Sequence, residues 1–459
     1  MTATDGRPGT DGRPAADGRP AADGRPAADG RPAAGSGPGA RAATRVSGTV
    51  VGLGLVSMVT DMSAEMVTAI LPLYLVYRVG VGYAQLGAID GLYTGATAAL
   101  RLVGGHLADR LRRPRLVAAF GYALSALTKL GFPLVGGSLA GISLVLAADR
   151  AGKGIRTAPR DALITLATPP AALGRAFGVH RALDTAGALL GPVLAFGLVA
   201  GLATGYDSVF AVSFCLGLVG VLLLLFLVPM PATGRRPDGA TPVTRGGPGL
   251  RAGLAVLGRS GPRRIAVAAG LLGLCTVGDM FLYLALQQRA GLDPAVLPLL
   301  PLGTALTFML AAAPVGRIAD RLGRWRVFLA GHVLLLAGYL LVAGVPGWPV
   351  AAAVLACHGL FYAATDGVLM ACAAPLIPEP VRATGLAVVQ TAQALTRAGG
   401  AVAFGLLAQS LTLRPAFLVF AAALGVALVA SARIGRQGTT RQGGAHTGHQ
   451  DIGRPGTAL

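Results

Sequence analysis

The chain of 459 residues is 53% hydrophobic and only 13% charged, and its mean hydropathy is +0.64. So few charged residues cannot cover the water-facing surface of a soluble protein, which excludes an ordinary soluble fold. The formal net charge of +19 would suit nucleic-acid binding. The arginines, however, gather in alternate connections between apolar stretches, a pattern that sets membrane topology. No nucleic-acid partner is therefore expected.

The chain opens with a low-complexity tail, residues 1–46, in which Asp-Gly-Arg-Pro recurs at intervals of six residues. Pro, Gly and balanced charge without large apolar residues cannot bury a core, so this tail is predicted to be disordered. The last residues, 434–459, have a similar composition and carry the same prediction.

Twelve apolar stretches lie between the tails, each of about 20 residues or more and therefore long enough to cross a hydrocarbon core. They cover residues 48–77, 84–107, 115–136, 139–158, 174–201, 206–230, 264–287, 294–317, 326–345, 347–375, 384–411 and 414–433. The polar stretch 231–263 is predicted to be a cytoplasmic linker between a bundle at 47–230 and a bundle at 264–433. The predicted fold is an all-α integral membrane protein with twelve transmembrane helices in two pseudo-symmetric six-helix bundles.

The arginines predict which side of the membrane each connection occupies. They are dense after the second and eighth apolar stretches and between the sixth and seventh, whereas the other connections are short and nearly uncharged. Because cytoplasmic connections carry the excess of Lys and Arg, both termini are predicted to be cytoplasmic.

One motif occurs twice, as GHLADRLRRPR from Gly105 to Arg115 and as GRIADRLGRWR from Gly316 to Arg326, 211 residues apart. Acids and arginines at a helix end can form charge-assisted hydrogen bonds in one conformation and lose them in another. The spacing indicates two homologous halves, and the motif is a candidate gate. Its candidate residues are Gly105, Asp109, Arg110, Arg113, Gly316, Asp320, Arg321 and Arg324.

These residues resemble the signature of the major facilitator superfamily, Gly-x-x-x-Asp-Arg-x-Gly-Arg-Arg, although Arg112 stands where the family has Gly. The resemblance implies alternating access around a site between the two halves, in a bacterial cytoplasmic membrane. A second resemblance is to the family's antiporter motif, whose final glycines are Ala195 and Phe196 here. Its matching residues are Gly178, Gly187, Gly191 and Pro192.

Acids inside apolar stretches are the candidates for proton coupling, because a buried acid beside an arginine can change protonation as access alternates. Asp61 and Glu65 lie four residues apart, on one helix face, and are the favoured pair. The other candidates are Asp90, Asp184, Asp279 and Asp366. A cation in mid-helix costs roughly 3 kcal/mol to insert and normally faces a cavity or an acid. The cavity cation candidates are Arg101, Arg150 and Arg181.

The sequence favours proton-coupled export of a small organic molecule, with the proton gradient in place of any cofactor. Clusters of His, Cys or Met that would bind a metal are missing from the apolar stretches, and no enzyme motif stands out. The expected partners are a small-molecule substrate and the lipid bilayer, and a monomer is expected. One alternative is an ion-coupled or facilitative importer of a small anion or metal chelate. Another is a non-transporting membrane sensor or scaffold that acts through its repeat tail.

Overall fold

The computed structural model describes residues 47–111, 113–169, 172–202, 205–229 and 250–445. Within these ranges it leaves out the side chains of residues 101–111, 174, 250, 252, 380, 383 and 435–445. The predicted tail 1–46 and most of the predicted linker therefore lie outside the described residues.

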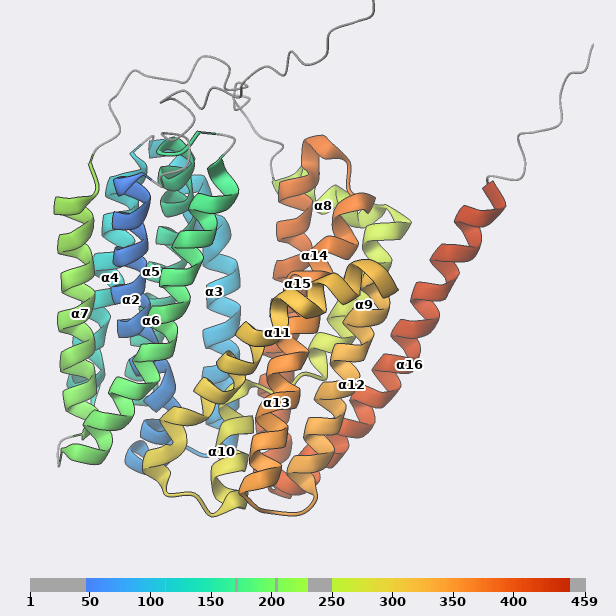
Figure 1. The fold of residues 1–459 in the computed structure, drawn as a ribbon. Coiled ribbons are helices and arrows are strands. Elements are labelled where there is room, and N and C mark those ends of the chain that lie inside the picture. The colour runs from blue at the N-terminus through green and yellow to red at the C-terminus, as the bar shows by residue number, and fades with distance from the viewer. Residues whose placement is uncertain (1–46, 112, 170–171, 203–204, 230–249, 446–459) are drawn as a thin grey trace, which may run out of the picture. The chain divides into compact units, whose positions relative to one another are not determined.

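The first half consists of six membrane-length helices, as predicted (Figure 1). They are α2 (Gly48–Leu73), α3 (Tyr83–Leu111), α4 (Pro114–Val135), α5 (Leu139–Leu166), α6 (Leu173–Gly201) and α7 (Gly205–Leu227). A π-helical segment, η1 (Tyr74–Val79), continues α2. Ser47 and Ser138 begin α2 and α5 because their hydroxyls accept hydrogen bonds from the free amides of the first turn.

The second half repeats the six-helix pattern with more interruptions. Its long elements are α9 (Ser260–Leu274), α10 (Asp279–Ala290), α11 (Leu300–Leu322), α12 (Arg324–Ala343), α13 (Trp348–Thr365), α15 (Arg382–Leu411) and α16 (Leu413–Ala445). Its short elements are α8 (Leu250–Ala255), η3 (Val256–Gly258), η4 (Pro294–Leu299), α14 (Val368–Ala373), η5 (Ala374–Leu376) and η6 (Glu379–Val381). Helical structure thus begins at Leu250, inside the stretch predicted to be linker.

Two stretches expected to be single helices are broken. The stretch 264–287 divides into α9 and α10 at Cys275–Gly278, where Gly278 has extended backbone angles. The hydroxyl of Tyr339, on α12, accepts a hydrogen bond from the Val277 amide at 2.7 Å and so satisfies a donor that the break exposes. The stretch 347–375 divides into α13 and α14 at Gly367, whose φ of +80° favours glycine.

Nine helical segments among the described residues are long and apolar enough to cross a membrane. The three other predicted spans correspond to α3, α5 and α15, which carry charged residues such as Asp90, Arg150 and Arg397. Intramembrane polar residues normally face the protein interior. The charged side chains of these three helices are therefore expected to face the protein interior and not the lipid.

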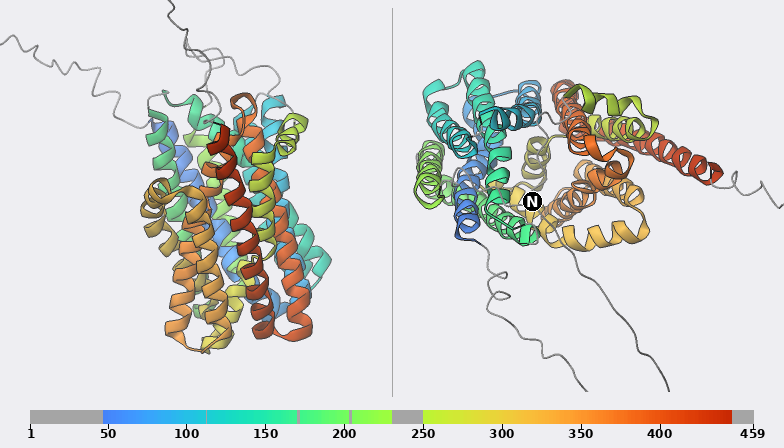
Figure 2. Two further views of the ribbon diagram at one scale, coloured as in Figure 1. Left: turned by 90° about the vertical axis from the view of Figure 1, so that its right-hand side faces the viewer. Right: turned by 90° about the horizontal axis from the view of Figure 1, so that it is seen from above.

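The packing follows the predicted division into halves. In the first half α2 packs on α6 and α7, and α5 packs on α3 and α4, while in the second half α13 packs on α11 and α12. The halves meet chiefly through α3 and α15, which run side by side between the two groups of helices (Figure 2).

Small residues form this contact between the halves. A Cβ atom at Gly87 of α3 would lie 2.6 Å from the carbonyl oxygen of Ala401 on α15, and a Cβ at Gly405 would lie 2.6 Å from the carbonyl oxygen of Tyr83. Neither position therefore accepts a larger residue without a shift of backbone. A hydrogen bond also links the halves close to the start of α3. The hydroxyl of Tyr77 on η1 donates to Gln287 Oε1 on α10 at 2.7 Å. We call the α3–α15 contact the inter-half interface.

Candidate functional site

A cavity of about 300 Å³ lies between the halves. Residues of α2, α10, η4, α11 and α13 line it, so both halves contribute. Its polar and aromatic lining consists of Glu65, Thr68, Asp279, Tyr283, Thr304, Phe308, Tyr362 and Asp366. A second cavity of about 340 Å³ lies beside α11, α13 and α14 and shares Phe308 and Asp366 with the first. The two cavities therefore adjoin at Asp366.

Three of the six predicted acids, Glu65, Asp279 and Asp366, line the first cavity. Glu65 comes from α2, and the Nζ atom of Lys153 on α5 lies 3.5 Å from its carboxylate. The side chains of Glu65 and Lys153 are about a quarter exposed, at 26% and 29%. This pair can therefore be reached by water or a ligand from the cavity.

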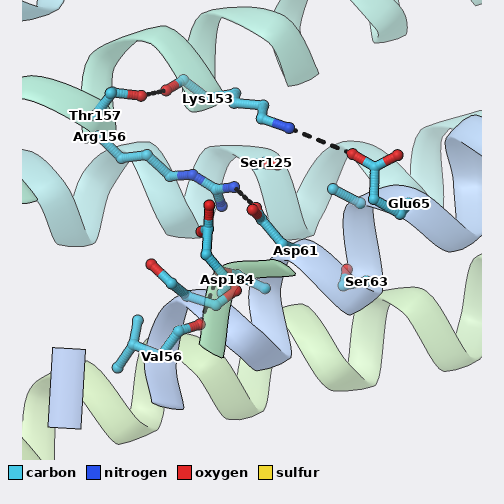
Figure 3. Close-up of polar contacts among 12 residues, drawn as sticks. Val56, Asp61, Ser63, Glu65, Ser125, Lys153, Arg156, Thr157 and Asp184 are labelled. Carbon is cyan, nitrogen blue, oxygen red and sulfur yellow. Dashed lines mark hydrogen bonds and ion pairs between the residues drawn. The ribbon is translucent and has the colours of Figure 1, made fainter. Parts of the chain in front are cut away.

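The favoured acid Asp61 lies one helical turn from Glu65 but belongs to a deeper cluster (Figure 3). Arg156 of α5 donates a hydrogen bond to Asp61 Oδ1 at 2.8 Å. The side chain of Asp184, on α6, lies beside that of Asp61 in this cluster (Figure 3). Arg160 lies 3.7 Å from Asp184. Three helices thus bring two carboxyl groups and two guanidinium groups into one buried cluster.

A second buried cluster centres on Asp149, which the sequence analysis did not single out. Lys129 of α4 and Arg150 both form ion pairs with the Asp149 carboxylate, and all three side chains are at most 5% exposed. Ser125 donates a hydrogen bond to the same carboxylate at 2.7 Å. The adjacent Asp-Arg pair in the sequence was a signal, but Lys129 is 20 residues away and only packing of α4 on α5 joins them.

The predicted cavity cations lie elsewhere. Arg150 turns toward Asp149 and toward Tyr93 of α3, whose hydroxyl accepts its hydrogen bond at 2.8 Å. Arg181 points outward, with 78% of its side chain exposed, and lies 3.4 Å from Asp184. Neither arginine lines the cavities, because each finds an acid on its own helix. The side chain of Arg101 lies outside the described part of the chain.

In the second half Asp279 is held by several groups at the start of α10. The hydroxyl of Tyr362 donates to its two carboxylate oxygens, at 2.8 and 2.9 Å. Arg397 of α15 donates to the Tyr362 hydroxyl at 2.8 Å and lies 3.9 Å from the carboxylate. His358 Nε2 lies 3.5 Å from it. Asp279 thus connects α10 with α13 and α15 at the wall of the cavity.

The second copy of the repeated motif connects three helices. Arg324, the first residue of α12, donates two hydrogen bonds to Asp320 of α11, at 3.1 and 3.0 Å. It also donates one to the carbonyl oxygen of Ala371 on α14 at 3.0 Å. Gly316 lines the second cavity, and Arg321 is exposed. This copy therefore provides breakable contacts beside the cavity.

The first copy of the motif spans the end of α3 and the start of α4. Gly105, Asp109 and Arg110 belong to α3, but the side chains of residues 101–111 lie outside the described part. Arg113 is exposed and directly precedes α4. The gate at this copy stays a prediction.

The glycine motif of α6 consists of Gly178, Gly187, Gly191 and Pro192. A Cβ at Gly187 would lie 2.1 Å from the carbonyl oxygen of Met58 on α2, and one at Gly191 would lie 2.8 Å from that of Met62. Gly187 and Gly191 thus set the close packing of α6 on α2, and so the approach of Asp184 to Asp61, whereas a Cβ at Gly178 would meet no atom within 4 Å. Among the residues that the structure describes, no group of His, Cys, Asp and Glu could hold a metal ion.

Comparison with known proteins identifies the family. The model of the Major Facilitator Superfamily matches residues 53–313 and 291–452. An uncharacterized MFS-type transporter of Methanocaldococcus jannaschii is 29% identical over 351 residues, which cover 75% of this chain and 84% of that protein. The multidrug resistance protein MdtH of Aeromonas hydrophila is 26% identical over 312 residues, 67% of this chain and 74% of its own.

A crystal structure of a variant of the nucleoside transporter NupG shares the fold, with a TM-score of 0.71 at 16% identity, over 84% of this chain and 99% of that one. The fold agrees with the two six-helix halves predicted from the sequence, and a cavity lies between them. The chain therefore belongs to the Major Facilitator Superfamily, as a multi-pass membrane protein that acts as a secondary transporter and is not an enzyme.

Proposed function

We propose that this transporter exports a small organic molecule in exchange for protons, by alternating access of the cavity between its halves. The observation that carries this proposal is the Asp61–Asp184 carboxyl pair, which lies beside Arg156 and one helical turn from the cavity acid Glu65. These residues supply both a place for an exchangeable proton and a short connection from it to the substrate.

The carboxyl pair favours proton exchange for an electrostatic reason. Two carboxyl groups in contact share a proton more readily than they carry two negative charges. Arg156 and Arg160 favour loss of that proton, because a guanidinium group stabilises an ionised carboxyl group. A small movement of α5 or α6 would therefore change which form is preferred, and the gain or loss of a proton would follow the conformational change.

Glu65 connects this pair to the substrate. Its carboxylate faces the cavity and is held by Lys153 at 3.5 Å, longer than an optimal charged hydrogen bond. A substrate that approaches Glu65 competes with Lys153 and with a proton for the same oxygens. If the substrate displaced Lys153 from Glu65, the Lys153 ammonium group would attract the nearby Asp61 carboxylate more strongly than it already does. Substrate and proton would thereby exclude each other, as an exchange mechanism requires.

The lining of the cavity supports an organic substrate over a small anion. Its aromatic rings and hydroxyl groups suit a partly apolar molecule. No lysine or arginine belongs to the described lining, so an anion would find carboxylates at the cavity wall. The importer of anions or chelates is therefore the less favoured alternative.

Export as the direction rests on two supports. The spacing of Gly178, Gly187, Gly191 and Pro192 resembles the antiporter motif, and one relative is named a multidrug resistance protein. With the arginine-rich connections in the cytoplasm, both termini lie there too. The proposed location is the cytoplasmic membrane of a bacterium.

A reconstitution experiment tests the proposal. Purified protein would first be screened by thermal shift against ethidium, uridine and dialanine, because a bound ligand raises the unfolding temperature with concentration. The probe that stabilises the protein would then be followed in proteoliposomes under an imposed pH gradient. We expect gradient-driven flux in the native protein and in the exposed-acid control Glu379→Gln, but none in Asp61→Asn with Glu65→Gln. Undiminished flux in that double variant would end the assignment.

A further inference from the structure

The side chain of Asp90, on α3, is buried in the inter-half interface without a partner. Only 5% of the residue is exposed. Its Oδ2 atom has no hydrogen-bond partner among the described residues, and its carboxyl group takes part in none of the described ion pairs. The other buried aspartates, Asp61, Asp149 and Asp184, each lie within 4 Å of at least one cationic side chain. Asp90 therefore needs a separate explanation.

The carboxyl group points at the break between α9 and α10. A Cβ atom at Gly278 would lie 1.5 Å from Asp90 Oδ2, and the next residue it would meet is Ala401 of α15, whose Cβ would be 3.4 Å away. Only glycine at this position lets the carboxyl group approach the start of α10. Asp90 thus lies where α3 of the first half meets α10 and α15 of the second, at the contact through which the halves meet.

Two charged groups face Asp90 from the helices packed against it, Asp279 on α10 and Arg397 on α15. Asp279 has the same sign and disfavours a second negative charge. Arg397 is already engaged, since it donates to Tyr362 and lies 3.9 Å from Asp279. Burial of an ionised carboxylate without a partner is strongly unfavourable, whereas burial of the protonated acid is far less so. The interface in this structure therefore favours the neutral form of Asp90.

We infer that Asp90 is a proton-binding site of the inter-half interface, protonated while α3 and α15 are in contact and ionised when they separate. This inference deepens the proposed function and rests on it for the source of the driving force. Proton binding at Asp90 would close this end of the transporter, and release of the proton into the opened gap would hold it open. The site is distinct from the Asp61–Asp184 pair, which lies within the first half.

The dependence of the closed-to-open ratio on pH has a definite direction and a maximum steepness. Because the closed state binds the proton, the ratio of closed to open molecules rises as pH falls. For one linked proton that ratio changes by at most about tenfold for each pH unit. The ratio becomes constant once the pH is low enough for Asp90 to be protonated in both states, or high enough for it to be ionised in both.

Distance measurements between spin labels test this without substrate or gradient. One label would replace Arg78 on η1 and the other Ser410 on α15, both exposed and on different halves, in a chain with its four native cysteines changed to alanine. We expect the short-distance population to grow as pH falls from about 9 to 5. In Asp90→Asn and in the smaller Asp90→Ala it should be large at every pH, because neither residue can ionise. The exposed-acid control Asp207→Asn should behave like the native chain.

Several outcomes overturn the inference. A native distance distribution that does not change with pH excludes a linked proton. A pH dependence that survives in both Asp90 variants and disappears in Asp61→Asn assigns the proton to the other cluster. Closure driven by Na⁺ in place of choline at constant pH, and lost with Asp90, would make the ligand a sodium ion. If gradient-driven flux is absent but the Asp90-dependent distance change is present, the inference stands and the proposed function fails.

Discussion

The Asp149 cluster allows the sharpest prediction about stability. Asp149→Asn removes the carboxylate that Lys129 and Arg150 share, while all three side chains stay buried. The asparagine amide keeps the shape and can still accept the Ser125 hydroxyl. Two cations are then left in contact range without their counter-charge. Because an uncompensated buried charge is the main cost of breaking a buried ion pair, the free energy of unfolding should fall by about 3–5 kcal/mol.

The measurement is equilibrium unfolding of purified protein in mixed micelles, followed by circular dichroism as the denaturing detergent is titrated. The matched control is Glu379→Gln, which breaks an exposed pair with Arg382 at 3.6 Å and should cost less than about 1 kcal/mol. Adding Lys129→Met to Asp149→Asn should restore part of the loss, because it removes one of the two unpaired cations. If Asp149→Asn costs no more than the exposed control, the cluster does not carry the stability assigned to it.

Three further substitutions address the interface, the helix break and the cavity wall. Gly405→Leu should cost about 1–3 kcal/mol by overpacking and should reduce the short-distance population between the spin labels at every pH; an unchanged distribution would contradict the tight contact. Tyr339→Phe removes the acceptor of the Val277 amide, so unfolding should become easier by about 1–3 kcal/mol in the same titration; equal stability would show that the amide finds another partner. Tyr362→Phe takes both hydroxyl contacts from Asp279 and should weaken binding of the stabilising probe by about tenfold in calorimetry, whereas unchanged affinity would separate this hydroxyl from the substrate site.

The fold was largely predictable because its main signals are local. Apolar stretches of membrane length predicted the helices, and the repeated Gly-x-x-x-Asp-Arg motif predicted the duplication. The breaks at Gly278 and Gly367 were not predicted. Their sequences stay apolar on both sides, and Tyr339, which satisfies the first break, comes from another helix.

The candidate site was predictable as a set of residue types and not as an arrangement. The cost of burying charge made every intramembrane acid and arginine a candidate. The sequence did not indicate that Arg150 would pair with Asp149, or that Asp90 would lack a partner. Those outcomes depend on which helix faces which, over separations such as the 95 residues between Asp61 and Arg156.

By itself, the sequence determined that this is a duplicated membrane protein, because helix length, hydropathy and repeated motifs are properties of single segments. It also determined which polar residues the membrane must accommodate. Only the tertiary structure decided which acids are neutralised, which face the cavity and which lies alone at the inter-half interface. The physical reason is that electrostatic stabilisation depends on distances of 3–4 Å between side chains, and those distances arise only when helices from both halves pack together.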